Sequence, residues 1–257
     1  MKTFVFKVGT STLIHPSGRV NLRRMEQLCK VLSDLANEGH RVVLVTSGAI
    51  GVGVGKLRLS GRPEDTPGKQ AAATVGQSEL MFLYDKFFSQ LGHIVGQLLI
   101  TKEDVQDEKR RENLTGAFDK LFHYGAIPIV NENDAVAVDE IVYGDNDSLS
   151  AVVAALIHAD TLFILTETGG LYDANPQLEP SAKLISIVPA VTDAIRACAS
   201  GSISAVGTGG MSTKVQAADF AARAGIDTYI FCGRRPDDIY RILSGERIGT
   251  HFLAQKE

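Results

Sequence analysis

The sequence lacks residues and patterns on which several functional classes depend. It has no tryptophan and only four methionines, so it offers no aromatic platform for stacking nucleic-acid bases. The three cysteines, Cys29, Cys198 and Cys232, are odd in number and far apart, which argues against a disulfide framework. The six histidines form neither an H-x-x-x-H nor an H-E-x-x-H pattern. We therefore expect no metal ion held by protein side chains.

Long apolar runs and a large excess of one charge are also missing. No stretch of about 18 consecutive apolar residues occurs, so we predict no membrane span. The formal net charge is −4, which does not favour nucleic acid as a partner. The chain begins with a strand-like segment, residues 4–8, rather than with a signal peptide. We therefore expect a cytoplasmic location.

What the sequence does contain is a regular alternation of apolar segments and helical patterns. Residues 41–46 form a continuous apolar run, which is typical of a parallel strand covered on both faces. The expected strands are residues 4–8, 41–46, 93–100, 127–130, 161–166, 184–188, 228–231 and 251–253. The expected helices are residues 21–37, 69–90, 108–124, 149–158, the segment after Lys214, and 237–243, with a hairpin over 135–143. This order predicts an α/β fold, a three-layer sandwich with a central, mostly parallel sheet flanked by helices.

A glycine-rich segment, Gly207–Lys214, precedes a helical pattern in the last quarter of the chain. Glycine lets the backbone approach a ligand closely, and the unpaired N–H groups at a helix start favour an anion. Lys214 would add a positive charge within the first helical turn. The segment is not a Walker A loop, because Thr213 rather than glycine precedes the lysine. We interpret it as a phosphate-binding segment, the alternative being an ordinary turn that caps a helix.

Polar residues follow the ends of several expected strands, where ligands gather in open α/β sheets. Lys7 lies inside an apolar strand, and a buried lysine is costly unless it faces an anion, so we interpret it as functional rather than as a snorkelling edge residue. Gly144–Ser148 places two carboxylates and an amide at a helix start, more than one cap requires. Asp147 could hold a lysine in place, and Asp145 and Asn146 could bind an ammonium or carboxylate group of a substrate.

These features favour phosphoryl transfer over acid–base hydrolysis. In phosphoryl transfer the protein mainly positions the reactants and neutralises charge, which two lysines and glycine-rich turns can do. A carboxylate acceptor is already ionised at pH 7 and needs no general base. This agrees with the lack of a Ser–His–Asp pattern. The residues alone indicate a small acidic acceptor and do not identify it.

Several segments together carry a resemblance to the glutamate 5-kinases, a group within the amino acid kinase family. In chain order they are residues 7–11 (KVGTS), 45–50 (VTSGAI), 130–134 (VNEND), 144–147 (GDND), 207–214 (GTGGMSTK) and 222–228 (ARAGIDT). The resemblance covers essentially the whole chain. It implies one amino acid kinase-like domain over residues 1–257, with an acceptor-binding part roughly at 1–150 and a nucleotide-binding part roughly at 151–257. It also implies ATP-dependent phosphorylation of the side-chain carboxylate of L-glutamate to L-glutamyl 5-phosphate, the first step of proline biosynthesis.

The same resemblance implies roles for individual residues. Lys7 and Lys214 would flank the transferring phosphoryl group, and Asp147 would orient both lysines. The residues implied for glutamate binding are Ser47, Gly48, Asn131, Asp134, Asp145 and Asn146. Those implied for nucleotide binding are Lys7, Gly9, Thr166, Glu167, Thr208, Gly209, Gly210, Met211, Ser212, Thr213 and Lys214. Mg²⁺ would bridge the ATP phosphates.

Other expectations concern departures from the family pattern and the surroundings of the site. Many relatives carry aspartate where Glu167 stands. The extra methylene of glutamate is expected to shift a contact of this side chain near the nucleotide. Many also carry a C-terminal PUA module, whereas this sequence ends at Glu257, so we expect a short form. The resemblance implies a homo-oligomer and feedback inhibition by proline. The segment 59–68, with two prolines and several charges, is expected to be a lid or a subunit contact.

Three other functions fit parts of the sequence. A kinase of the same family acting on aspartate, N-acetylglutamate, carbamate or a nucleoside monophosphate is an alternative, because the residues alone do not define the acceptor. A nucleotide sensor without catalysis is disfavoured by the presence of both lysines and Asp147. A Rossmann dehydrogenase is suggested by Gly51–Gly55, but Lys56 stands where the third glycine is required. A packed, glycine-rich helix start is the better interpretation of that segment.

Overall fold

The structure is a computed structural model that describes residues 1–15, 17–136, 146–200 and 210–255. The strands in these residues are β1 (Thr3–Val8), β2 (Arg41–Val45), β3 (Ile94–Ile100), β4 (Ala126–Glu132), β5 (Thr161–Thr166), β6 (Ile187–Val188), β7 (Asp227–Cys232) and β8 (Thr250–Phe252). The helices are α1 (Thr10–Leu13), α2 (Leu22–Asn37), α3 (Ala49–Leu57), α4 (Thr66–Gln90), α5 (Lys102–Gln106), α6 (Glu108–His123), α7 (Asn146–Leu156), α8 (Asp193–Ser200), α9 (Met211–Arg223) and α10 (Asp238–Leu243). The hairpin predicted over 135–143 lies largely outside the described residues.

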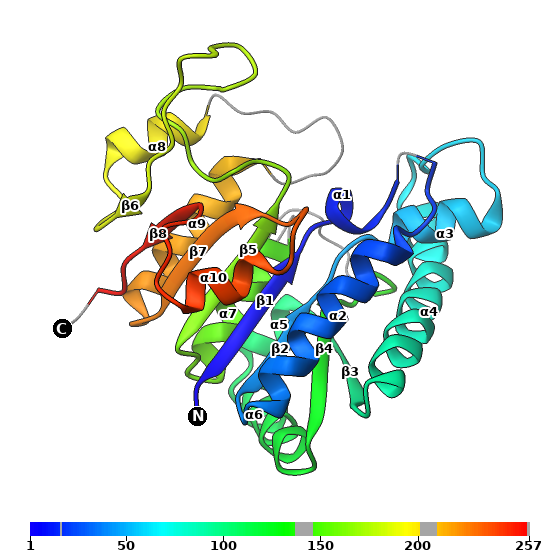
Figure 1. The fold of residues 1–257 in the computed structure, drawn as a ribbon. Helices are drawn as coiled ribbons and strands as arrows, with labels where there is room; N and C mark the ends of the chain where they lie inside the picture. The colour runs from blue at the N-terminus through cyan, green and yellow to red at the C-terminus, as the bar shows by residue number, and fades with distance from the viewer. Residues whose placement is uncertain (16, 137–145, 201–209, 256–257) are drawn as a thin grey trace.

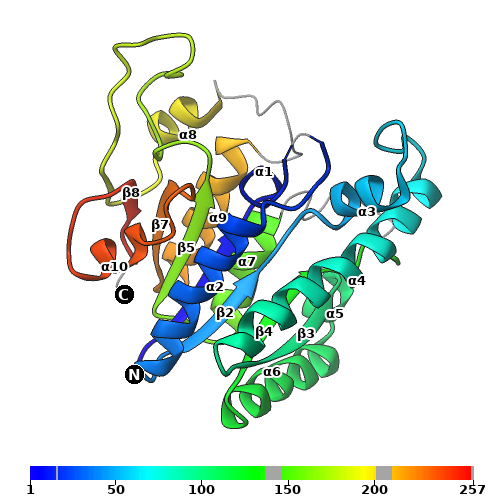
Figure 2. The same ribbon diagram turned by 45° about the vertical axis from the view of Figure 1, so that its right-hand side comes forward.

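The described strands form one sheet in the order β3-β4-β2-β1-β5-β7-β8-β6. Of the pairs in this sheet, β7 and β8 are antiparallel and the others are parallel. Figures 1 and 2 show helices on both faces of the sheet, so the predicted three-layer α/β fold is confirmed. Because β1 lies between β2 and β5, the chain moves outward from β1 in both directions. Such a switch point leaves a crevice at the carboxyl ends of the strands.

Alternation along β1 decides which side chains enter which layer. Phe4 and Phe6 belong to the apolar layer that also contains residues of α2, α4 and α10. Val5 belongs to the opposite layer, with residues of α7 and α9. Phe6 stacks on Phe163 of β5, with ring centroids 4.8 Å apart, and this stacking holds the two central strands together. Lys7 follows Val5 by two positions and therefore faces α7 and α9.

Several helices begin at residues that supply a cap. The side chain of Asn21 accepts a hydrogen bond from the Arg24 amide (3.1 Å), and the side chain of Asp107 accepts one from the Arg110 amide (2.8 Å). Asp65 caps α4 by accepting from the Gly68 amide at 2.7 Å. This cap explains why α4 begins at Thr66, earlier than the apolar spacing predicted.

The glycine-rich segment after β2 forms α3, which packs closely on α4. A Cβ atom at Gly53 would overlap the carbonyl oxygen of Ala72, and one at Gly76 would overlap the carbonyl oxygen of Ala49. The two helices therefore meet backbone to backbone, which only glycine allows. This arrangement confirms that Gly51–Gly55 is the start of a packed helix rather than a dinucleotide-binding motif.

Three short helices, α1, α5 and α8, were not predicted. Helices α1 and α5, of four and five residues, are too short to show a helical repeat of apolar residues. Within the part of the chain that the structure describes, no helix combines the length and apolar character needed to cross a membrane.

Candidate active site

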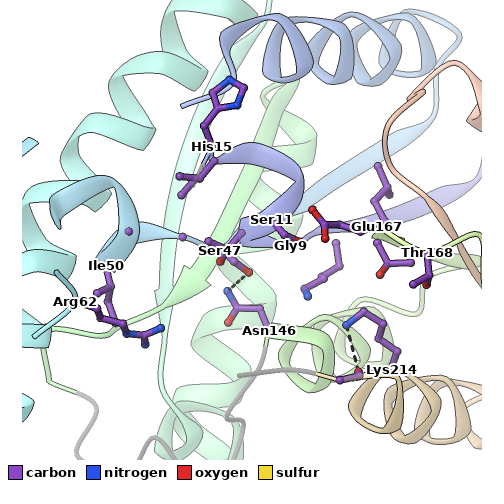
Figure 3. A pocket seen from close by; sticks show the side chains of 18 of the residues that line it. Gly9, Ser11, His15, Ser47, Ile50, Arg62, Asn146, Glu167, Thr168 and Lys214 are labelled. Carbon is purple, nitrogen blue, oxygen red and sulfur yellow. Dashed lines mark hydrogen bonds between the residues drawn. The ribbon is translucent and has the colours of Figure 1, made fainter. Parts of the chain in front are cut away.

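A cavity of about 950 Å³ opens at the carboxyl ends of the central strands, where the chain order reverses. Figure 3 shows part of it from close by. The residues predicted for the site that line it are Lys7, Gly9, Ser47, Gly48, Asn131, Asp134, Asn146, Thr166, Glu167, Gly210, Met211 and Lys214. Segments far apart in the sequence therefore meet around one space.

Two lysines and one aspartate form a buried charged centre at this cavity. Lys7 Nζ lies 2.5 Å from Asp147 Oδ1, and Lys214 Nζ lies 2.9 Å from Asp147 Oδ2. Asp147 is fully buried, and Lys7 and Lys214 are 2% and 7% exposed. Buried charges need partners, and here two ammonium groups share one carboxylate. Two ammonium groups brought close together at the cavity favour an anionic ligand beside them.

Three separate elements bring this centre together. The alternation of β1 turns Lys7 towards α7 and α9, and the first turns of those helices carry Asp147 and Lys214. The prediction that the helix over 149–158 starts near Leu149 was wrong. Its first described residue is Asn146, so Asn146 and Asp147 lie inside α7. A carboxylate in the first turn of a helix is favoured by the helix dipole.

The start of α9 is attached to the charged centre. Thr213 Oγ1 lies 3.0 Å from Asp147 Oδ2 and 2.9 Å from the carbonyl oxygen of Gly210, and either oxygen can accept its hydrogen. Lys214 Nζ also donates to the Gly210 carbonyl, at 3.4 Å. Gly210 supplies no side-chain cap to the helix. The first N–H groups of α9 therefore lie at the cavity without a capping side chain, which favours an anion there.

The neighbouring wall of the cavity is built from neutral polar groups. Asn146 Nδ2 donates to Asn131 Oδ1 at 2.6 Å and to Ser47 Oγ at 3.1 Å, the second bond being drawn in Figure 3. The same nitrogen donates to the carbonyl oxygen of Thr46. Asn131 Nδ2 in turn donates to Gln77 Oε1, at 2.8 Å. These bonds tie α7, β2, β4 and α4 into one network.

Helix α4 also supports the end of β2. The hydroxyl groups of Thr46 and Tyr84 are hydrogen-bonded at 2.8 Å. Burial raises the pKa of Tyr84 well above its usual range, so its hydroxyl stays neutral. Beyond Thr46 the chain turns at Gly48, whose φ of +98° is in the left-handed region. A Cβ atom at Gly48 would lie 2.5 Å from Ile14 Cδ1, so this turn requires glycine.

The opposite side of the cavity is more open. Figure 3 shows Glu167 and Thr168 across the cavity from Ile50 and Arg62. Glu167 is exposed, and its backbone oxygen accepts a weak hydrogen bond from Cys232 Sγ at 3.6 Å. A Cβ atom at Gly9 would lie 3.7 Å from Lys7 Nζ, so Gly9 brings the backbone close to this ammonium group at the cavity.

Some predicted residues are not part of the cavity wall. Asp147, Ser212 and Thr213 do not line it, because Asp147 and Thr213 lie behind the ammonium groups and contact each other. Asp145, Thr208 and Gly209 lie outside the described residues.

Sequence reasoning missed other polar residues of the wall. They include His15, Arg19, Arg58, Arg62, Tyr172, Asn175, Gln177 and Arg234. Arg62 points into the cavity on the side of Ser47 and Asn146 (Figure 3). It lies in the segment 59–68, which was predicted to be a lid or a subunit contact. An arginine in a loop has no spacing that would distinguish a cavity wall from a solvated surface.

Within residues 1–15, 17–136, 146–200 and 210–255, no group of three or more His, Cys, Asp or Glu side chains is arranged to hold a metal ion. The carboxylates that line the cavity therefore do not gather into a metal site in this part of the chain.

A mostly parallel sheet with two buried lysines at a cavity beside its switch point fits an α/β phosphoryl-transfer enzyme. The chain belongs to the amino acid kinase family, whose sequence model matches residues 2–232. Among its relatives is a glutamate 5-kinase from Clostridium perfringens, 49% identical over 259 residues that cover 99% of this chain and 96% of that protein. A glutamate 5-kinase from Moorella thermoacetica is 50% identical over 255 residues, covering 99% of this chain and 68% of the relative.

Solved structures with low sequence identity share the fold. Isopentenyl phosphate kinase from T. acidophilum, in a product complex, is 17% identical, with a TM-score of 0.67 and coverage of 97% of this chain and 99% of that one. UMP kinase from Bacillus anthracis is 16% identical, with a TM-score of 0.65, and the match covers 99% of this chain and 97% of that one. At this identity the likeness concerns the fold alone.

Proposed function

We propose that this chain transfers the γ-phosphoryl group of ATP to the side-chain carboxylate of L-glutamate, forming L-glutamyl 5-phosphate for proline biosynthesis. The observation that carries the proposal is the placement of Lys7 and Lys214 around one buried carboxylate, next to a wall of oriented amides. The names of relatives at about half identity point to the same acceptor. The reaction needs charge neutralisation and alignment more than proton transfer.

The chemical step uses groups that are already charged. A carboxylate oxygen of glutamate attacks the γ-phosphorus of ATP, the new O–P bond forms, and the bond from the γ-phosphorus to the β–γ bridging oxygen breaks as ADP leaves. Lys7 and Lys214 flank the transferring group and stabilise the negative charge that develops on its oxygens. Asp147 holds both ammonium groups in place without itself touching the substrates.

The nucleotide is assigned to the side of the cavity formed mainly by residues after 150. The phosphates would contact the backbone at Gly9 and at the start of α9, where Gly210 and Met211 line the cavity. Thr208, Gly209, Ser212 and Thr213 belong to the same proposed segment. Thr166 and Glu167 would contact the nucleotide farther from the phosphates.

Magnesium fits this site as an ion carried by the nucleotide. The described residues do not gather the carboxylates and imidazoles that a resident ion would need. Bound to the ATP phosphates, Mg²⁺ would add positive charge to that of the two lysines. Asp147 is already occupied by both ammonium groups, so we assign it no metal-binding role.

The acceptor is assigned to the side formed by residues before 150. The residues proposed to hold it are Ser47, Gly48, Asn131, Asp134, Asp145 and Asn146. Arg62 points to the same side and would supply a positive charge for a second carboxylate (Figure 3). Glutamate carries such a carboxylate in addition to the one that reacts. Feedback inhibition by proline and assembly into a homo-oligomer stay predictions from the resemblance.

The test is a product assay with a panel of acceptors. The protein is incubated with ATP, Mg²⁺ and hydroxylamine, which traps an acyl phosphate as a hydroxamate that is identified by mass spectrometry. We expect γ-glutamyl hydroxamate, formed only when glutamate and ATP are both present, with ADP released in equal amount. Aspartate, N-acetylglutamate and UMP serve as competing acceptors. Turnover with one of these, and none with glutamate in folded protein, would overturn the proposal.

A further inference from the structure

Three amide side chains form a line from the inside of α4 to the cavity. Gln77 Oε1 accepts from Asn131 Nδ2 at 2.8 Å, and Asn131 Oδ1 accepts from Asn146 Nδ2 at 2.6 Å. Their exposed fractions are 9%, 2% and 7% in that order, so water does not compete for these bonds. Of the three, Asn131 and Asn146 line the cavity, whereas Gln77 does not.

The orientations of the Asn131 and Asn146 amides are fixed by backbone groups, whose donor or acceptor character is unambiguous, and Gln77 is oriented through Asn131. The backbone N–H of Glu132 donates to Asn131 Oδ1 at 2.9 Å, so this oxygen cannot exchange places with the nitrogen. Asn131 Nδ2 must therefore find an acceptor, and Gln77 Oε1 is that acceptor. At the other end, the carbonyl oxygen of Thr46 accepts from Asn146 Nδ2.

This arrangement determines which atom of Asn146 remains for a ligand. Its nitrogen has two hydrogens and is surrounded by three protein acceptors, on Thr46, Ser47 and Asn131. Both hydrogens of this nitrogen are therefore donated to protein acceptors. Oδ1 is the atom of this cavity-lining amide that is left to interact with a bound molecule, and an amide oxygen can only accept a hydrogen bond.

We propose that Gln77 is a positioning residue that keeps Asn146 Oδ1 available as an acceptor for the α-ammonium group of the substrate. The proposal rests on the proposed function and deepens it, because it assigns an orientation to glutamate in the cavity. The ammonium group lies against Asn146, and the carboxylate that does not react lies towards Arg62. Without Gln77 Oε1, Asn131 Nδ2 loses its acceptor, and the Glu132 N–H alone is left to hold the Asn131 amide, so Asn131 and Asn146 are positioned less tightly.

The proposal is tested with Gln77→Leu, which removes the acceptor oxygen, and Gln77→Glu, which keeps an oxygen at the same reach. Gln90→Leu, the same substitution at the exposed far end of α4, is the matched control. We expect Gln77→Leu to raise KM for glutamate at least tenfold, with kcat and KM for ATP changed less than threefold. Gln77→Glu should restore KM for glutamate to within threefold of the wild-type value.

A second readout reports the ammonium contact directly. Glutarate has both carboxylates of glutamate but no ammonium group. The wild-type preference for glutamate over glutarate, as a ratio of kcat/KM, should fall about tenfold in Gln77→Leu and stay unchanged in Gln90→Leu. If Gln77→Leu does not fold, Gln77→Asn takes its place, since its shorter side chain cannot reach Asn131.

The outcomes separate this inference from the proposed function. An unchanged glutamate/glutarate ratio in a folded Gln77 variant would overturn the inference, as would a loss of kcat shared equally by Gln77→Leu and Gln77→Glu. Failure of the wild-type protein to form γ-glutamyl hydroxamate would instead overturn the proposed function.

Discussion

Two parts of the same cavity wall are held together by different forces. Lys7, Asp147 and Lys214 meet through full charges, whereas Asn131 and Asn146 meet through neutral amides. Charge attraction is strong but has little directional preference, which suits a centre that must neutralise the spread-out charge of a phosphoryl group. Amide hydrogen bonds are weaker but fix which atom points where, which suits the recognition of one small molecule. Substitutions of the charged residues should therefore mainly lower kcat, whereas substitutions in the amide network should mainly raise KM for glutamate.

The largest effect is expected from Asp147→Asn. This change removes the carboxylate that pairs with both buried ammonium groups, and breaking a buried ion pair by removing one member costs about 3–5 kcal/mol. We expect a loss of that size in the free energy of unfolding, measured by urea titration, together with a lower kcat. A stability equal to that of the wild-type protein would mean that Asp147 does not compensate the lysines.

Single lysine substitutions should affect turnover more than folding. In Lys7→Ala or Lys214→Ala the remaining ammonium group still compensates Asp147, but the developing charge loses one donor. We expect kcat to fall by about 10²–10³ or more, equivalent to about 3–4 kcal/mol of barrier. Lys7→Arg and Lys214→Arg should not restore activity, because a planar guanidinium does not replace a compact ammonium.

The control for these variants is Lys30→Ala, at an exposed lysine of α2 that pairs with Glu26. Its kcat should equal that of the wild-type protein in the same coupled ADP-release assay. If both site lysines can be removed with little loss of kcat, the charged centre has no part in the reaction.

A smaller effect is expected where α3 and α4 meet. In Gly76→Ala the added methyl group would overlap the carbonyl oxygen of Ala49 and push the helices apart, at about 1–3 kcal/mol of stability. Because Gly76 precedes Gln77, the shift should also raise KM for glutamate more than KM for ATP. Gly116→Ala in α6 is the control, since open space surrounds that position and alanine favours a helix. Thermal unfolding of both variants measures the difference.

The smallest effect is expected from Arg62→Gln. Arg62 is exposed, so solvent and salt screen its charge. We expect KM for glutamate to rise about tenfold at low salt and less at high salt, with KM for ATP and kcat unchanged. Arg23→Gln on α2, an exposed arginine outside the cavity, should change none of these constants. A salt-independent effect, or none, would remove Arg62 from the acceptor side.

The central part of the fold could be predicted because its signal is local. The strands that flank the site are continuous apolar runs, and a parallel sheet brings their carboxyl ends to one edge. Lys7, Ser47, Asn131 and Thr166 lie at or just after the ends of such strands and line one cavity, and the family resemblance implied the roles of the last three. The start of α7 was predicted too late, because polar residues in a first turn resemble a loop that precedes the helix.

Residues that support the site from inside a helix could not be predicted in the same way. Gln77 and Tyr84 lie in the middle of α4, where a polar residue in a helical pattern normally indicates the solvent face. Only the packing of α4 against the ends of β2 and β4 turns them inward, and no local spacing encodes that packing. Arg62, in the segment 59–68, was missed for a similar reason, since a charged loop has the same sequence pattern whether it covers a cavity or faces water.

The central position of β1 couples the beginning of the chain to segments synthesised much later. Lys7 lies on the first strand, yet its counter-charge is on α7, and the second lysine on that carboxylate is on α9. During synthesis on the ribosome this ammonium group can meet Asp147 only after the second half of the chain has begun to emerge, and contacts this distant in sequence slow folding. A nucleotide that bridges both lysines would then connect early and late segments of the chain. The free energy of unfolding should therefore increase with the concentration of nucleotide.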